Sequence, residues 1–186
     1  MLEIVIPETE LFDSETNCFT NVKQTKLQLE HSLLSISKWE SRYKKPFLGD
    51  GENLQSMPIY EFIDYVKDMT ITKNVDPDVY LAIISYPKIQ AAIYEYMNDP
   101  MTATTFSNVS QHVGSKQVIT AEVIYWEMTE LNIPFECQKW HLNRLMTLIR
   151  VCSIKRGKPE KMSHKEMAAQ RRALNRSRKA ARHSRG

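Results

Sequence analysis

The stretch Val118–Ile154, VITAEVIYWEMTELNIPFECQKWHLNRLMTLIRVCSI, predicts two helices joined by a proline-containing elbow. Thr120 is a good N-cap, because its hydroxyl can accept a hydrogen bond from an otherwise unpaired amide of the first turn. Pro134 ends the first helix and fits the first turn of the second, where a missing N–H does no harm. The apolar positions are Val123, Ile124, Met128 and Leu131, then Cys137, Trp140, His141, Leu145, Leu148, Ile149 and Cys152. This helical pair predicts the core of a mainly α fold.

Upstream of this pair, the chain begins with a small β element, predicted over residues 1–25. Leu2–Ile6 is a largely β-branched run stopped by Pro7, and a strand–turn–strand pattern covers residues 11–20. A sheet this small is marginal by itself, so it should lie on helices or add to the edge of a partner's sheet.

Residues 26–156 are predicted to form a helical body. Apolar spacing favours a first helix over Lys26–Tyr43, ended by Pro46. A capping residue or a proline in the first turn marks the start of three more helices. These start signals stand at Ser56 with Pro58, Asp76 with Pro77, and Tyr86 with Pro87. Residues 101–117 are rich in Ser and Thr and suit a loop or a small hairpin.

Charge divides the chain into an acidic body and a basic C-terminal tail. From Lys155 onward there are 12 basic residues and two acidic ones, while residues 1–154 hold 13 basic and 20 acidic residues. In the tail, residues 157–186, a capping box at Ser163 and Glu166 and several alanines favour a helix. The residues available for contact with phosphate or an acidic partner are Arg171, Arg172, Arg176, Arg178, Lys179, Arg182 and Arg185.

Three interpretations of this tail stay open. It can be a solvated extension, it can dock on an acidic protein surface such as that of another copy, or it can contact nucleic acid. Contact with nucleic acid would weaken steeply as salt is added, because binding releases counterions. From Lys155 to the end there is no Phe, Tyr or Trp, so the tail has no stacking platform for single strands.

Cysteine usage and hydropathy predict a soluble protein of a reducing compartment, so we expect it in the cytoplasm. The three cysteines make no disulfide framework. The apolar run Leu2–Ile6 is too short for a signal peptide, and no apolar segment approaches the roughly 20 residues that span a bilayer.

The sequence contains no recognisable catalytic motif. Cys137 and His141, four residues apart on the predicted second helix, could supply metal ligands with Cys152, or a nucleophile and its base. A fourth ligand, an orienting group and an oxyanion site are missing, so a buried thiol with a structural histidine beside Trp140 is the better interpretation. We therefore expect no enzyme activity, no cofactor and no metal.

The segment Trp39–Phe47 mixes large aromatic side chains with cations. Trp39, Arg42, Tyr43 and Phe47 could form an exposed protein-interaction patch, because Trp, Tyr and Arg carry much of the binding energy at interfaces. The alternative, a helix end that packs its aromatic side chains inward, agrees better with burial preferences. All three tryptophans are predicted to be core residues.

Several segments resemble a family of bacteriophage proteins from the tail-gene region. They are LEHSLLSISKWESRYKKPFL (29–48), MTATTF (101–106), ITAEVIYWEMTELNIPFECQKWHLNRLMTLIRVC (119–152) and KMSHKEMAAQRRALNRSRKA (161–180). The N-terminal LEIVIPETELFDSETNCF (2–19), a strand–turn–strand pattern before helices, is similar to the start of tail assembly chaperones.

This resemblance covers nearly the whole chain. It implies a non-enzymatic chaperone that escorts the tape-measure and tail-tube proteins in the host cell cytoplasm, with self-association left open. Such chaperones usually end in an acidic or neutral region, and the basic end here departs from that pattern. The departure favours an alternative, a structural protein of the virion whose tail contacts nucleic acid or an acidic partner near the head–tail junction.

Overall fold

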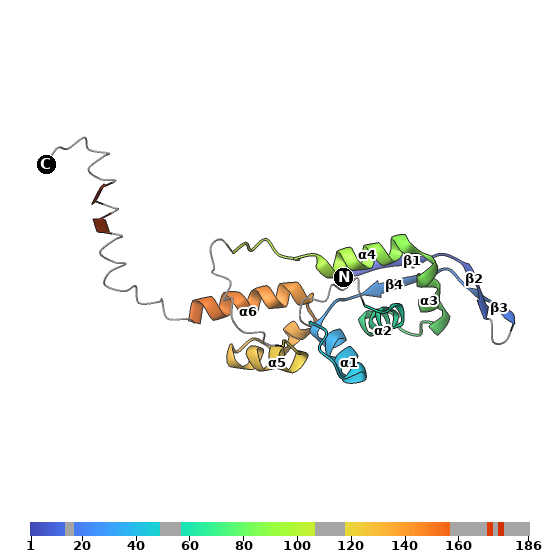
Figure 1. Cartoon of the computed structure of the whole chain (residues 1–186), viewed down its shortest axis with the longest axis horizontal. Helices are drawn as coiled ribbons and strands as arrows, with labels where there is room; N and C mark the ends of the chain where they lie inside the picture. Colours follow the sequence, from blue (N-terminus) through green and yellow to red (C-terminus); the bar gives the residue numbers. More distant parts are fainter. Residues whose placement is uncertain (14–16, 49–56, 107–117, 157–170, 173–174, 177–186) are drawn as a thin grey trace. The chain divides into compact units, whose positions relative to one another are not determined.

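The computed structural model describes residues 1–13, 17–48, 57–106, 118–156, 171–172 and 175–176. The chain divides into two compact units, Met1–Cys152 and Ser153–Gly186. The described residues form six α-helices and two small antiparallel sheets of two strands each, so the predicted mainly α class with an N-terminal β element is confirmed (Figure 1).

The two sheets are the inner and outer halves of one long hairpin. Strand β1 (Leu2–Ile6) pairs with β4 (Thr25–Leu29), and β2 (Thr9–Asp13) pairs with β3 (Cys18–Val22). The last inner pair, Ile6 with Thr25, and the first outer pair, Thr9 with Val22, are separated by two residues on each side. The register therefore continues without a bulge through the interruption, where Pro7 cannot donate to a ladder.

The predicted helix over Lys26–Tyr43 is wrong in its first part. Residues Thr25–Leu29 form strand β4, and helix α1 begins only at Leu33 (Leu33–Tyr43). The strand alternates buried Leu27 and Leu29 with outward Lys26 and Gln28, a period of two that satisfies both faces. Ser32 then caps α1, its hydroxyl accepting from the amide of Ser35.

The remaining helices of the first unit follow the hairpin in the chain. They are α2 (Ile59–Met69), α3 (Pro77–Ala82), the 3-10 turn η2 (Ile83–Ser85), α4 (Pro87–Asn98), α5 (Ala121–Glu130), the 3-10 turn η3 (Phe135–Lys139) and α6 (Leu142–Arg156), whose last turn enters the second unit. Helix α4 packs against β1, and α2 and α5 pack against α1. The predicted start at Asp76 is confirmed, since its carboxylate accepts from the amide of Asp78 at 3.1 Å. The predicted cap at Ser56 lies outside the described residues, as do residues 107–117; residues 101–106 form no helix or strand.

The second helix of the predicted pair, expected to run on from Pro134, is interrupted, so this prediction is wrong in its first part. A 3-10 turn ends at Lys139, Trp140 is extended, and α6 starts at Leu142. The break lies where the chain contacts a segment far away in sequence. His141 forms a β-bridge with Ser32, and the amide of Leu142 donates to the carbonyl of His31 at 2.7 Å.

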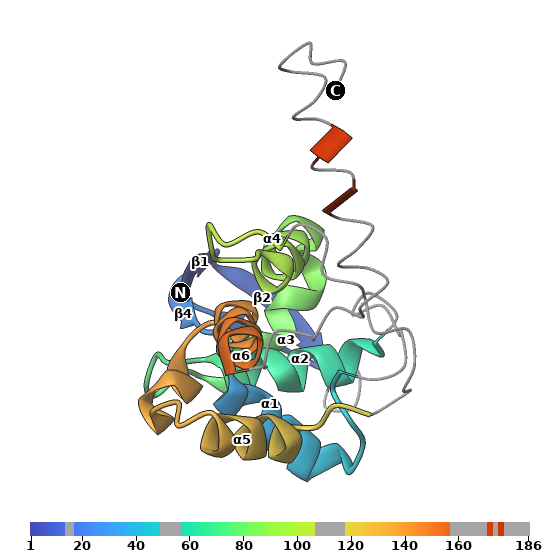
Figure 2. The ribbon, with the colours of Figure 1, turned by 90° about the vertical axis from the view of Figure 1, so that its left-hand side faces the viewer.

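The start of α5 is capped by a side chain from another helix. Thr120 occupies the N-cap position, but its hydroxyl accepts no capping hydrogen bond, contrary to the prediction. Instead the buried carboxylate of Glu40 on α1 accepts from the Ala121 amide through Oε2 and from the Phe47 amide through Oε1, each at 2.7 Å. One carboxylate thus joins α1, the segment after it and α5, which lies beside α1 in Figure 2.

Candidate functional site

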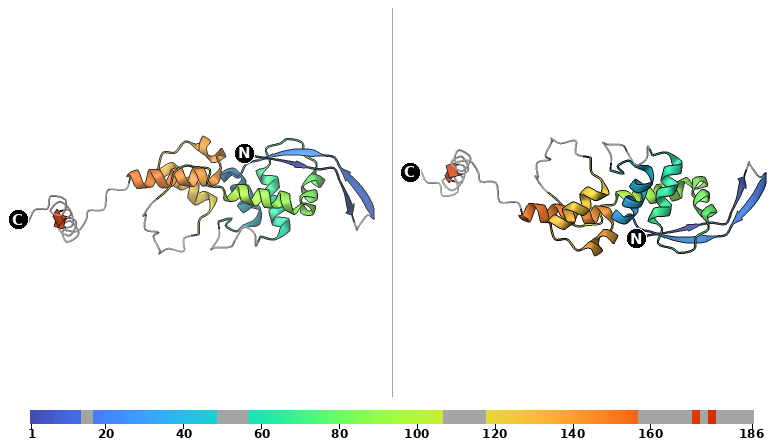
Figure 3. Two further views of the ribbon diagram at one scale, coloured as in Figure 1. Left: turned by 90° about the horizontal axis from the view of Figure 1, so that it is seen from above. Right: turned by 90° about the horizontal axis from the view of Figure 1, so that it is seen from below.

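The outer hairpin, residues 9–13 and 18–22, extends beyond the helices at one end of the first unit (Figure 3). One of its faces packs on α3. Val22 is buried there, Leu11 is half-buried, and the hydroxyl of Thr9 shares a hydrogen bond with that of Tyr86. The outer hairpin therefore packs on the helices of the first unit through this face.

The opposite face presents an aromatic pair, Phe12 and Phe19, referred to below as the Phe pair. The two residues are partners in the β2–β3 register, and their rings lie 5.1 Å apart at 49°. Phe12 is 54 % exposed and Phe19 is 71 % exposed. Single exposed apolar residues are common, but two adjacent phenyl rings that nothing in the described part of the chain covers form a surface typical of protein contacts.

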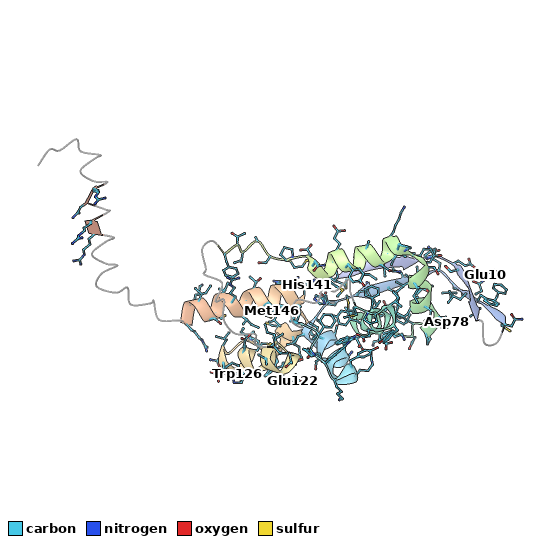
Figure 4. The ribbon with its side chains drawn as sticks, viewed as in Figure 1. Glu10, Asp78, Glu122, Trp126, His141 and Met146 are labelled. Atoms are coloured by element: carbon cyan, nitrogen blue, oxygen red, sulfur yellow. The ribbon has the colours of Figure 1, made fainter. Side chains whose placement is uncertain are left out.

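Polar groups border the Phe pair on the same face. Glu10 and Asn21 are the next partners along the ladder, and Asn21 donates from its amide nitrogen to Glu8 Oε1 at 3.1 Å. Glu10 lies on the outer hairpin in Figure 4. An aromatic centre with a polar rim is the usual anatomy of a protein-binding surface.

Two aromatic residues of the predicted interaction patch at the end of α1 are buried rather than exposed. Trp39 is only 1 % exposed and donates from its indole nitrogen to the Glu61 carbonyl at 3.2 Å, and its ring meets that of buried Phe47 at 5.1 Å. The exposed-patch interpretation is corrected for these two rings, because both belong to the core. Inward packing describes their positions.

The two other members of that patch hold α1 against α2. Arg42 binds the Asp68 carboxylate in a bidentate manner at 2.9 and 3.0 Å, and the Tyr43 hydroxyl donates to Asp64 at 2.7 Å. Burial, together with that hydrogen bond, raises the pKa of Tyr43 to about 12. Burial also raises the pKa of Asp68, although the guanidinium of Arg42 opposes it. These contacts are internal to the unit.

The cysteine and histidine residues considered as ligands do not converge. Cys137 is buried in η3, where burial raises the pKa of its thiol, and Cys152 lies on α6. His141 directs Nε2 to the carbonyl of Tyr96 at 3.0 Å. Among the described residues, no group of three or more His, Cys, Asp or Glu side chains is arranged to hold a metal ion.

His141 instead belongs to a buried pair with His31. The two rings meet edge-on with centroids 5.1 Å apart, and His31 Nδ1 lies 2.5 Å from the hydroxyl of Tyr65. Burial, with a smaller effect of His141, lowers the pKa of His31 to about 3. Burial lowers the pKa of His141 as well. Both rings are therefore neutral at ordinary pH.

The basic tail is described at only a few of the predicted contact residues. Arg171, Arg172 and Arg176 are helical and exposed. The other four predicted contacts lie outside the described residues: Arg178, Lys179, Arg182 and Arg185.

One tryptophan differs from the prediction that all three are core residues. Trp126 is 63 % exposed, because Ile124 and Met128 turn the other side of α5 toward the core. Trp140 is half-buried and packs against the core, with the guanidinium of Arg144 4.3 Å from its ring centre. Trp126 and Glu122 are both labelled on α5 in Figure 4.

Sequence reasoning found the strands of the outer hairpin but not the Phe pair as a site. A signal was present, since a hairpin closed by the turn at residues 13–17 places Phe12 opposite Phe19. The signal does not tell which face is covered by helices.

None of the helices in the described segments is long and apolar enough to cross a membrane.

Searches for related proteins return nothing that could assign this site. The chain matches no protein-family model, no curated protein and no solved structure.

Proposed function

We propose that this protein is a non-enzymatic assembly factor of bacteriophage tails, a chaperone that holds segments of the tape-measure and tail-tube proteins until they assemble. The observation that carries the proposal is the exposed Phe pair on the outer hairpin. The resemblance of the sequence to tail-gene-region proteins supplies the identity of the partners. The absence of a recognisable catalytic motif from the sequence agrees with a binding role.

The Phe pair is suited to reversible capture of an apolar segment. Aromatic side chains contribute a large contact area with little loss of conformational freedom, and those at the centre of an interface dominate its free energy. The rim of Glu8, Glu10 and Asn21 is polar, so the surface remains compatible with water when no partner is bound.

Replacing both phenylalanines, Phe12→Ser with Phe19→Ser, should weaken partner binding and leave the fold intact. Because the pair is exposed, the free energy of unfolding should fall by less than about 1 kcal/mol, the size of a cross-strand pair. Affinity for co-expressed tape-measure or tail-tube protein should fall at least about tenfold. Co-purification with the tagged chain and urea unfolding measure the two quantities.

The matched control is Trp126→Ser, which removes an equally exposed aromatic ring from α5. This variant should bind as the parent does. Equal loss of binding in both variants, or none in either, would contradict a role for the Phe pair.

Quantitative mass spectrometry of purified particles and infected-cell lysate tests the transient role. We expect the protein in the lysate and not in the particle, because a chaperone leaves when assembly is complete. A fixed copy number in the particle would instead favour a structural protein of the virion. The exposed arginines Arg171, Arg172 and Arg176 support that second candidate, since they are available to phosphate or to an acidic partner.

A further inference from the structure

The acidic residues beside the Phe pair lie on one side of it, toward the inner half of the long hairpin. Glu10 and Asn21 form the ladder pair next to Phe12 and Phe19. Side chains on one face of a strand repeat every second residue, which is about 7 Å along the strand. Asn21 donates to Glu8 Oε1 at 3.1 Å, so the carboxylate of Glu8 is held on the same side of the rings. A partner that covers the rings therefore comes close to two carboxylates.

Neither carboxylate is neutralised within the described part of the chain. On the inner half of the hairpin, Lys26 on β4 binds Glu3 on β1 at 2.7 Å. Glu8 and Glu10 are exposed and form no such ion pair with a described residue. The sequence of residues 8–23 contains four acidic residues and one basic residue. The outer hairpin therefore carries a surplus of negative charge beside an apolar centre.

Charge at the rim of an interface selects among partners more than it adds affinity. Opposite charges speed association and bring a partner into register, whereas like charges placed together are unfavourable. An acidic segment on the Phe pair would be repelled by Glu8 and Glu10, and a basic segment would bind them. The rest of the body adds to this preference, since residues 1–154 hold 13 basic and 20 acidic residues. The surface therefore distinguishes apolar segments by the charge that borders them.

We infer that the segments of tail proteins held by this surface, called client segments below, are apolar stretches bordered by lysine or arginine. This inference rests on the proposed chaperone function and specifies which segments are held. The Phe pair covers the apolar side chains, and Glu8 and Glu10 bind the cations. The spacing along β2 sets the distance between the apolar side chain and the cation, about 7 Å, which is close to one helical turn or two residues of a strand.

Two synthetic peptides of about ten residues test the charge preference with the full chain. Both have the same leucine-rich centre, and one carries lysines at both ends where the other carries glutamates. Titration calorimetry measures the dissociation constant of each peptide. The lysine peptide should bind at least about threefold more tightly in about 0.1 M salt. The difference should shrink in about 1 M salt, because the Debye length falls from about 10 Å to about 3 Å.

A double variant, Glu8→Gln with Glu10→Gln, locates the preference on the outer hairpin. Glutamine removes the charge but keeps an oxygen that can accept from Asn21, so the fold should be unchanged, which urea unfolding checks. The two peptides should bind this variant about equally. The matched control, Glu122→Gln with Glu136→Gln, removes two exposed acids of α5 and η3. It should keep the preference of the parent, because Glu122 lies far from Glu10 in the first unit (Figure 4).

The outcomes distinguish this inference from the proposed function. If both peptides bind the parent equally, or if the preference survives in the Glu8 and Glu10 variant, selection by charge is overturned and capture by the Phe pair stands. If neither peptide binds and no tail protein co-purifies with the chain, both are overturned. Equal loss of the preference in the control variant would attribute it to the charge of the whole body and overturn the role of Glu8 and Glu10.

Discussion

Replacing Glu40 with alanine is expected to lower the free energy of unfolding by about 3–5 kcal/mol, a large loss for a single substitution. The carboxylate accepts hydrogen bonds from two buried backbone amides, those of Phe47 and Ala121. Each buried N–H left without an acceptor lowers the free energy of unfolding by about 1–3 kcal/mol. Urea unfolding with linear extrapolation measures the change.

Two further variants show whether the two amides account for the loss. Glu40→Gln retains one acceptor oxygen and should lie between the parent and Glu40→Ala. Glu122→Ala removes an exposed acid from the first turn of α5, where only the helix dipole gains from its charge, and should cost less than about 1 kcal/mol. A Glu40→Ala protein as stable as the Glu122→Ala protein would show that α5 does not depend on this cap.

Acid is expected to unfold the first unit through the buried histidine pair. The pKa of His31 falls from its ordinary value of 6.5 to about 3 in the folded chain, so the unfolded chain binds a proton more readily below pH 6.5. Stability is therefore complete above about pH 6.5 and falls as the pH drops toward about 3. His31 alone should remove about 2 kcal/mol between pH 7.5 and pH 5.

His141 adds to this loss in the same direction. Burial lowers its pKa, although its hydrogen bond to the Tyr96 carbonyl and the carboxylates of Glu30 and Asp99 partly oppose the shift. Titration between about pH 7 and pH 5 avoids the range in which most carboxyl groups of the unfolded chain change charge.

The variant His31→Asn tests the assignment, because asparagine can keep a hydrogen bond near the Tyr65 hydroxyl but does not titrate. The unfolding free energy of this variant should depend less steeply on pH, although its value at neutral pH is lower. An unchanged slope would show that His31 does not control the acid response.

Local chemistry made part of the fold predictable. Asp76 is the N-cap of α3 and Pro77 stands in its first turn, so the start of this helix could be predicted from two adjacent residues. The strands β2 and β3 could also be predicted, because they are close neighbours in the sequence.

The errors arose where distant segments decide the local structure. Leu29, Leu33 and Ile36 have helical spacing, but Leu27 and Leu29 also fit a strand, and pairing with β1 selects the strand. The break before Leu142 likewise depends on His31, more than one hundred residues earlier. The Phe pair follows the same rule: the register places the rings together, while the packing of α3 on the other face leaves them exposed.

The unbroken register of the long hairpin constrains how its tip can vary. A single-residue insertion in one strand between Ile6 and Phe12 would turn one phenyl ring to the face that packs on α3 and separate it from the other. Matched insertions of two residues in both strands would lengthen the outer hairpin and keep the rings together. Because Ile6 and Leu27 fix the pairing inside the core, the buried end of the hairpin sets the geometry of the surface that meets a partner.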